Sequence, residues 1–270
     1  MAAELHLVEL EALTHAGMVR DHNEDRHLLR PPLMVVADGM GGAQAGEVAS
    51  GVAVDTIGAL PDGVGAEELK EAVIRANREI RRMAEENPRQ SGMGTTVTAA
   101  LLREGGVEVV QVGDSRAYLL RAGALRQITQ DHSVVAELVR RGDLSPKEAE
   151  QHPRRNVITR ALGADAEVRP DTFSVDLVPG DVLALCSDGL CGYVSDDDIA
   201  RALRDSPTLK RAAERLIELA NDAGGPDNIT VVLARLGGDA DIAVTEEMDT
   251  DRRADPTAET VAGSREELGL

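Results

Sequence analysis

Residues 96–121 read TVTAALLREGGVEVVQVGDSRAYLLR, three runs rich in valine and leucine that are separated by the short segments REGG and GDSR. This is the spacing of strands joined by tight turns. Connections this short, each with glycine, favour antiparallel pairing, because a parallel crossover needs about a dozen residues or more. The stretch therefore predicts antiparallel sheet rather than βαβ units.

Other segments of the chain extend this pattern. Strand-like runs also occur at 33–37, 172–178, 182–186 and 229–236, in addition to 96–102, 107–112 and 117–121. Residues 66–86 place apolar side chains every three or four positions, which predicts an amphipathic helix. Further helices are predicted to begin at Ser145, at Ser195 and at residues 206–207. We expect an α+β domain whose helices cover antiparallel sheet.

The composition excludes several classes of partner. The 270 residues include 48 acidic and 29 basic side chains, a net charge of −19, which disfavours nucleic acid and anionic membranes. One Phe, two Tyr and no Trp leave no platform for stacking bases. We find no signal-peptide pattern and no run of the roughly 18 apolar residues that span a membrane. A cytoplasmic location is therefore expected.

The composition changes at residue 237. Residues 237–270 hold ten acidic side chains and three arginines, with no periodic apolar face. Such a segment is typical of a disordered tail. We therefore predict one folded domain over 1–236 and an acidic, disordered tail over 237–270.

Four aspartates lie at the ends of predicted strands. Each of them, Asp38, Asp114, Asp188 and Asp227, has Gly, Ser or Asn beside it. A single Asp-Gly pair is an ordinary turn. If the four meet at one sheet edge, however, only cations make the cluster tolerable. Oxygen ligands favour Mg²⁺ or Mn²⁺, and Gly39 lacks the Cβ that would keep its carbonyl from a metal.

A separate segment, VRDHNEDRHLL, adds Arg20, Glu24 and Asp25. A guanidinium pairs bidentately with phosphate, so Arg20 is a candidate to hold an anionic substrate group. The carboxylates of Glu24 and Asp25 are candidates to accept hydrogen bonds from metal-bound waters. An exposed salt-bridge cluster is the alternative interpretation of the same residues.

Six motifs in order resemble one known family. They are RxxNED at 20–25, ADGMGG at 37–42, GTT at 94–96, GDSR at 113–116, SDG at 187–189 and DN at 227–228. With these motifs the chain resembles the metal-dependent PPM (PP2C-like) serine/threonine protein phosphatases, most of all the stand-alone bacterial type. The resemblance runs from about residue 5 to 236. It implies a four-layer α-β-β-α sandwich, two antiparallel sheets flanked by antiparallel helices, with a binuclear metal centre at one edge.

The resemblance also implies roles for the metal ligands. Asp38 would bridge two Mn²⁺ or Mg²⁺ ions, and Gly39 would offer its main-chain oxygen to one of them. Asp188 and Asp227 would complete the pair of sites, and Asp114 would bind a third ion. A water or hydroxide between two ions would then attack the phosphorus directly, without a phosphoenzyme.

The implied substrates are phosphoserine and phosphothreonine in proteins, with Arg20 on the phosphate and Glu24 and Asp25 orienting metal waters. The expected partners are a bacterial Ser/Thr kinase and its targets, and the protein itself is expected to be a monomer. Eukaryotic members carry His after the Asp-Gly, where a general acid has been proposed. This chain has Met40, whose thioether donates no proton, so the general acid stays unassigned.

Some alternatives stay open. Residues 133–165 correspond to the flap of bacterial relatives, where Arg154, Arg155 and Arg160 either attract phosphorylated segments or form solvated surface. Two other functions are a phosphatase dedicated to a transcription regulator and a non-catalytic module that binds phosphoproteins. Phosphate release with and without a chelator separates an enzyme from a binding module.

Overall fold

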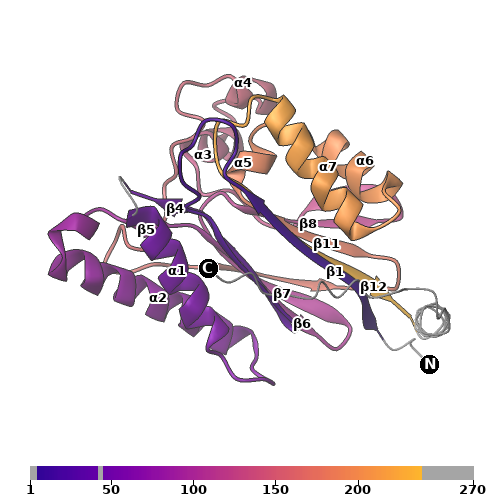
Figure 1. Cartoon of the computed structure of the whole chain (residues 1–270), viewed down its shortest axis with the longest axis horizontal. Coiled ribbons are helices and arrows are strands. Elements are labelled where there is room, and N and C mark those ends of the chain that lie inside the picture. The colour runs from indigo at the N-terminus through magenta and orange to yellow at the C-terminus, as the bar shows by residue number, and fades with distance from the viewer. Residues whose placement is uncertain (1–4, 42–44, 239–270) are drawn as a thin grey trace, which may run out of the picture.

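Two antiparallel sheets form the centre of the structure, a computed structural model that describes residues 5–41 and 45–238 (Figure 1). Sheet A has the strand order β1 (His6–His15), β12 (Ile229–Gly237), β11 (Val182–Cys186), β8 (Arg116–Arg121), β9 (Ala124–Gln127). Sheet B has the order β10 (Asp171–Asp176), β7 (Gly106–Val112), β6 (Val97–Arg103), β3 (Leu33–Ala37), β2 (Arg26–Arg30). A two-stranded ribbon pairs β4 (Gly39–Met40) with β5 (Gly94–Thr95).

Helices cover the outer face of each sheet (Figure 1). Sheet B is covered by α1 (Ala45–Gly58) and α2 (Ala66–Glu86), and sheet A by α6 (Asp196–Asp205) and α7 (Leu209–Asp222). The short helices are η1 (Pro88–Gln90), α3 (Val134–Arg141), α4 (Pro146–Glu150) and α5 (Asp188–Cys191). The predicted four-layer α-β-β-α sandwich is confirmed. No helix in the described part of the chain is long and apolar enough to cross a bilayer.

Central strands are apolar on both faces because each face packs against a different layer. In β3, Leu33 and Val35 contact the layer of α1 and α2, whereas Met34 points into the layer between the sheets. In β11, Ala184 faces α6 and α7, and Leu185 faces the other sheet. Strands buried on both sides appear in the sequence as continuous apolar runs. This is why residues 33–37 and 182–186 were predicted with their observed bounds.

The stretch 96–121 forms one hairpin and one crossing between sheets. Strands β6 and β7 pair antiparallel, with Arg103 opposite Gly106, as the REGG turn predicts. The second expected hairpin was wrong, because β8 belongs to sheet A and pairs with β9 and β11. Gly113 has φ +111°, and a Cβ there would lie 2.5 Å from the Thr96 side chain. The chain therefore leaves sheet B at Gly113, and Asp114 lies at the crossing.

Predicted helix starts agree with the structure at two of three places. The Ser145 and Ser195 hydroxyls accept hydrogen bonds from the third residue of α4 and of α6. The third start was two residues early, since the capping side chain of α7 is that of Thr208. Helix α2 has the predicted bounds. Strands β1, β2 and β9 and helix α1 were not predicted from the sequence.

The predicted boundary at residue 236 falls one residue short of the last strand. Gly237 ends β12 and pairs with His6 of β1, so it belongs to sheet A. Residues 239–270 of the predicted tail lie outside the described residues.

Candidate metal centre

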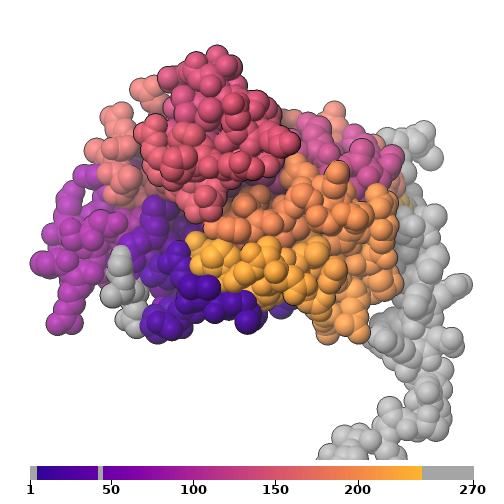
Figure 2. Space-filling view, turned by 90° about the horizontal axis from the view of Figure 1, so that it is seen from above, coloured from indigo at the N-terminus to yellow at the C-terminus, as the bar shows by residue number. Residues whose placement is uncertain are grey.

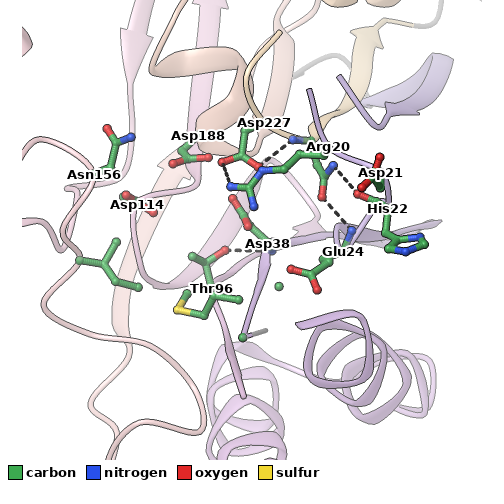
Figure 3. A pocket seen from close by; sticks show the side chains of 15 residues that line it. Arg20, Asp21, His22, Glu24, Asp38, Thr96, Asp114, Asn156, Asp188 and Asp227 are labelled. Carbon is green, nitrogen blue, oxygen red and sulfur yellow. Dashed lines mark hydrogen bonds and ion pairs between the residues drawn. The ribbon is translucent and has the colours of Figure 1, made fainter. Parts of the chain in front are cut away.

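Four strand ends, two from each sheet, surround one cavity of about 570 Å³ (Figure 3). Asp38 follows β3 and Asp114 follows β7, both in sheet B. Asp188 follows β11 and Asp227 precedes β12, both in sheet A. All four aspartates line this cavity. The sequence expectation that they gather at one edge agrees with their placement.

Hydrogen bonds fix the backbone on both sides of Asp38. Its N–H donates to Thr96 Oγ1 at 3.1 Å. Its carbonyl accepts from the Thr96 N–H and from Thr95 Oγ1, both at 2.9 Å. Thr96 Oγ1 in turn lies 2.8 Å from Ser115 Oγ, in the loop that carries Asp114. The GTT and GDSR motifs therefore fix the positions of Asp38 and Asp114, the two carboxylates of sheet B, relative to each other.

Gly39 packs directly against the start of α1. A Cβ at Gly39 would lie 2.2 Å from the Gly46 carbonyl oxygen and 2.6 Å from the Glu24 carbonyl oxygen. The structure thus gives a reason for glycine that the sequence argument did not, namely close contact with α1 and the 20–25 segment. This packing places β4 beside the cavity.

The two carboxylates of sheet A have different partners. Asp188 begins α5, and its Oδ1 is buried without a hydrogen-bond partner. Asp227 accepts from the Asn228 N–H through Oδ1 and from Arg20 Nη2 through Oδ2, both at 2.9 Å. Arg20 is therefore the cation that the structure places against this acidic wall (Figure 3).

The cluster holds protons more tightly than isolated carboxylates do. Burial, and then the charges of Asp25 and Asp188, raise the pKa of Asp38. Burial, and then Asp188, raise the pKa of Asp114 to about 8. Burial also raises the pKa of Asp188, with a further contribution from Asp227. Acidic groups that repel one another in this way are stabilised as anions by cations.

The donor set fits hard divalent ions in its chemistry. It consists of carboxylate oxygens around one cavity, and one of them, Asp188 Oδ1, lacks any partner. Within residues 5–41 and 45–238, however, no three acidic, His or Cys side chains form a ready-made ion site. Asp227 is paired with Arg20.

Asp25 lies directly behind the cavity wall with its Oδ1 buried and without a hydrogen-bond partner, and its role in orienting metal-bound water stays a prediction. It is buried and is not among the residues that line the cavity, whereas Arg20 and Glu24 are. Its Oδ2 accepts from Ser187 Oγ at 2.8 Å and from Thr230 Oγ1 at 2.6 Å. Burial raises its pKa to about 7. Asp25 thus fixes the residue before Asp188 from behind the cavity wall.

Two further residues hold the site together. Asn228 donates to the carbonyls of Ala16 and His22 at 3.0 and 2.9 Å, and accepts from the Glu24 N–H at 2.8 Å. It thereby fixes the segment that carries Arg20. Asn228 belongs to a sequence motif but had no predicted role, because these partners lie more than 200 positions away.

His132 is buried and clamps the turn before Asp114. Its ring Nδ1 accepts a hydrogen bond from the Gly113 N–H at 3.1 Å, and its main-chain N–H donates to the Gly113 carbonyl at 3.0 Å. Its Nε2 lies 3.1 Å from Asp171 of β10. The sequence predicted only that a helix begins here, and Ser133 does cap α3.

Comparison with known proteins decides the family. The family model of protein phosphatase 2C matches residues 21–234. The chain belongs to the protein phosphatase 2C family. The serine/threonine phosphatase stp of Listeria monocytogenes is 42% identical over 236 residues, 83% of this chain and 94% of that protein. The family match and this relative agree with the resemblance seen in the six motifs.

Solved structures of the family have the same fold. The serine/threonine phosphatase PstP/Ppp of Mycobacterium tuberculosis is 43% identical, with a TM-score of 0.81 over 87% of this chain and 99% of that chain. The catalytic domain of PstP in complex with two manganese ions is 41% identical, with a TM-score of 0.79 over 87% of this chain and all of that chain. The serine/threonine phosphatase Stp1 of Staphylococcus aureus is 37% identical, with a TM-score of 0.81 over 88% of this chain and 98% of that chain.

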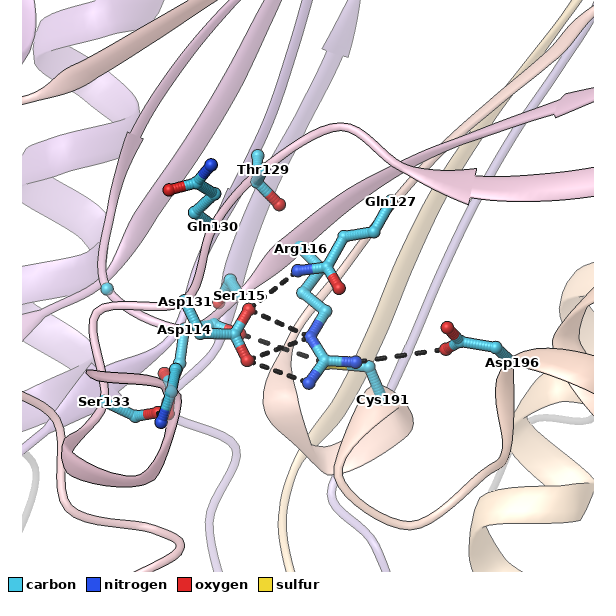
Figure 4. Close-up of polar contacts among 12 residues, drawn as sticks. Asp114, Ser115, Arg116, Gln127, Thr129, Gln130, Asp131, Ser133, Cys191 and Asp196 are labelled. Atoms are coloured by element: carbon cyan, nitrogen blue, oxygen red, sulfur yellow. Dashed lines mark hydrogen bonds and ion pairs between the residues drawn. The ribbon is translucent and has the colours of Figure 1, made fainter. Parts of the chain in front are cut away.

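This protein phosphatase 2C domain has a second cavity, of about 550 Å³, beside the first. Asp114, Asn156 and Asp188 line both. The Arg116 guanidinium lines the second cavity and donates to Asp131 through Nε and Nη2 at 2.8–3.1 Å (Figure 4). Helices α3 and α4 of residues 133–165 border it, and this segment stands out from the surface in Figure 2.

Proposed function

We propose that the chain is a metal-dependent protein phosphatase that hydrolyses phosphoserine and phosphothreonine in proteins. The observation that carries the proposal is the cavity where Asp38, Asp114, Asp188 and Asp227 meet from two sheets, with Arg20 at its rim. The relatives support the substrate class, because they are named serine/threonine phosphatases.

We propose that Asp38, the Gly39 carbonyl, Asp188 and Asp227 hold two divalent cations, and that Asp114 holds a third. The PstP complex with two manganese ions supports the pair, and oxygen donors accept Mn²⁺ and Mg²⁺ alike. When bound, the pair supplies a nucleophile from water at neutral pH and neutralises charge on the phosphoryl oxygens. The partnerless Asp188 Oδ1 supports this assignment.

The chain's own residues then bind and orient the substrate. The Arg20 side chain, 51% exposed, lines the cavity, where its guanidinium pairs with Asp227. A phosphate dianion competes for that guanidinium, so Arg20 moves from the carboxylate to the substrate. We propose that Glu24, at the same wall, and Asp25, whose Oδ1 is buried behind it without a hydrogen-bond partner, orient metal-bound water. Met40, also at the wall, offers no proton.

Further parts of the proposal concern partners. We expect the enzyme to oppose a bacterial Ser/Thr kinase and to act on that kinase and its targets. We expect residues 133–165 to act as a flap beside the cavity, because Asn156 and Ile158 from this segment line it. The cytoplasmic location and the monomeric state stay predictions from the sequence.

Hydrolysis of p-nitrophenyl phosphate with Mn²⁺ tests the proposal. The wild type should release phosphate with Mn²⁺ and stop when a chelator is added. Asp38→Ala should lower kcat by about 10³-fold or more, because it removes a ligand shared by both ions. Its thermal unfolding should remain cooperative. Silence of the wild type under every metal condition would favour a non-catalytic phosphoprotein-binding module, and near-normal turnover by Asp38→Ala would refute the metal assignment.

A further inference from the structure

The second cavity adjoins the cavity of the metal centre on the side away from Arg20. Asp114, Asn156 and Asp188 line both cavities. In Figure 3, Asp114 and Asn156 lie on the opposite side of the metal-centre cavity from Arg20. A substrate segment whose phosphate reaches the metal centre, and which continues past Asn156, therefore passes into the second cavity.

One wall of the second cavity is apolar. The helices α3 and α4 supply this wall, which consists of Val135, Ala136, Val139, Pro146 and Ala149. Helix α3 is amphipathic, yet none of its residues is fully buried, because its apolar face borders the cavity instead of a packed core. The volume of about 550 Å³ is typical of ligand-binding cavities, so substrate side chains have room to enter.

Among the described residues three arginines line this cavity, and one of them is paired with a carboxylate. Arg116 donates to Asp131 through Nε and Nη2 (Figure 4). Arg140 donates through Nη1 to the main-chain carbonyl of Asp131 at 3.1 Å, but it has no ion pair within residues 5–41 and 45–238. Arg155 is exposed, and in the described part of the chain its guanidinium has neither a hydrogen bond nor an ion pair. Arg140 and Arg155 are therefore available to an incoming anion.

The acidic side chains of the lining do not cancel these two charges. Bound cations neutralise the metal-centre aspartates, and Arg116 neutralises Asp131. Glu150 is then the remaining acidic residue of the lining, against Arg140 and Arg155. With metal bound, the second cavity thus carries an excess of positive charge in a chain whose net charge is −19. An anionic group that enters it is attracted.

The other arginines of this segment are placed differently. The sequence left open whether Arg154, Arg155 and Arg160 attract phosphorylated segments or form solvated surface. Arg160 pairs with Asp171 at 2.9 Å and does not line the second cavity. Arg154 lines neither the second cavity nor that of the metal centre. Of these three arginines, Arg155 alone is therefore a candidate to contact a substrate in the second cavity.

The opposite side of the metal-centre cavity has the opposite charge. Asp21 and Glu24 line it together with Arg20, which is assigned to the phosphate that is hydrolysed (Figure 3). A second anionic group of the substrate on that side would meet like charges. The attraction for such a group is therefore confined to the side of the second cavity.

We propose that the second cavity binds an anionic side chain of the substrate, a carboxylate or a second phosphate, on one side of the phosphoserine or phosphothreonine that is hydrolysed. Arg155 and Arg140 pair with the anion, and the apolar wall covers the methylene groups that carry it. This inference rests on the proposed phosphatase function and names the class of phosphorylated segment that the enzyme favours.

Phosphothreonine peptides with one glutamate, placed in turn at each neighbouring position and compared with glutamine there, test the inference. At saturating Mn²⁺, kcat/KM should rise by about fivefold for glutamate at a position on one side and should not rise on the other. The non-hydrolysable phosphonate analogue of phosphothreonine at the favoured position should give about tenfold, because it carries more charge and pairs bidentately with a guanidinium. Both preferences should shrink as the salt concentration is raised.

Substitutions of the arginines locate the effect. Arg155→Gln should reduce the glutamate preference to less than about twofold, whereas Arg155→Lys should retain most of it, because lysine keeps the charge. Arg140→Gln should reduce the preference by a smaller factor, since Arg140 already donates to a main-chain carbonyl. Arg154→Gln is the matched control: it removes the same charge from the adjacent residue, which lines neither cavity, and should leave the preference unchanged.

The outcomes separate this inference from the phosphatase proposal. Acceleration by glutamate alone identifies a carboxylate subsite and acceleration by the phosphonate alone a phosphate subsite, and either supports the inference. Equal kcat/KM for glutamate and glutamine with no gain from the phosphonate, a preference of equal size on both sides, or one that survives Arg155→Gln combined with Arg140→Gln would overturn the inference while turnover leaves the phosphatase proposal intact. A wild type that hydrolyses neither the peptides nor p-nitrophenyl phosphate would overturn both.

Discussion

Without divalent cations, the carboxyl cluster should make the folded protein less stable as the pH rises. Burial raises the pKa of Asp25 to about 7 and that of Asp114 to about 8. The same groups titrate near pH ~3.9 in the unfolded chain. Between these values the folded state binds protons that the unfolded state has already released. The free energy of unfolding is therefore highest at the acidic end of this window and falls until the folded carboxyls have ionised.

The size of the effect follows from Asp25. A group that is protonated only in the folded state lowers the free energy of unfolding by about 1.4 kcal/mol for each pH unit. From pH 5 to pH 7, Asp25 alone gives about 2 kcal/mol, because it is already half ionised in the folded state at pH 7. A domain of this size loses roughly 2–4 °C in Tm per kcal/mol, so Tm should fall by roughly 4–8 °C. Saturating Mn²⁺ should largely abolish the slope, because the bound ions favour the ionised carboxylates.

Thermal unfolding in EDTA at pH 5, 6, 7 and 8, followed by circular dichroism at fixed ionic strength, measures this slope. The net charge of −19 adds a general repulsion among the charges of the folded protein. The variant Asp38→Asn distinguishes this repulsion from the effect of the carboxyl cluster. This variant keeps the shape of the side chain but removes one titrating group whose pKa is raised. Its Tm should exceed that of the wild type by more at pH 8 than at pH 5. A Tm that is flat or rises toward pH 8 in EDTA, or an unchanged slope in Asp38→Asn, would refute the reasoning.

Three further predictions concern single residues of the site. Arg20→Ala should raise KM for p-nitrophenyl phosphate by about tenfold or more and lower kcat less, and steady-state kinetics showing the reverse would contradict a binding role. Gly39→Ala should cost about 2 kcal/mol or more, because its Cβ would meet the Gly46 carbonyl oxygen at 2.2 Å, whereas Gly51→Ala, with nothing within 4 Å, should leave Tm unchanged or higher. Asp114→Ala should raise the Mn²⁺ concentration needed for half-maximal turnover, and an unchanged metal titration would exclude it as a ligand.

The sequence predicted those elements whose burial is uniform. Strands β3 and β11 are apolar throughout, since both faces are covered. Strand β1, with the sequence HLVELEALTH, mixes charges with apolar residues and was missed. Its Glu9 accepts the Leu209 N–H at the start of α7 and pairs with Arg235. A glutamate in a strand is explained only by those distant partners.

Helix α1 was missed for a related reason. Its sequence, AGEVASGVAVDTIG, has three glycines and no clear apolar stripe. Gly46 is required because a Cβ there would lie 2.7 Å from the Gly39 carbonyl carbon. The local sequence of α1 therefore serves close packing beside the cavity rather than helix formation.

The candidate site was predictable to the level of residue type and strand end. Aspartates that close apolar runs signalled a shared edge, and Asp38, Asp114, Asp188 and Asp227 do line one cavity. The burial of Asp25 was not predictable, because its hydroxyl partners lie 162 and 205 positions away.

The aliphatic layer between the two sheets has a consequence for catalysis. Half of the carboxylates belong to one sheet and half to the other, and Met34, Leu185 and Val232 fill the space between. The thickness of this layer sets the distance between the carboxylates of sheet B, Asp38 and Asp114, and those of sheet A, Asp188 and Asp227. A substitution that adds or removes a methylene in this layer, far from any charge, would change the affinity of the site for its ions while the protein still folds.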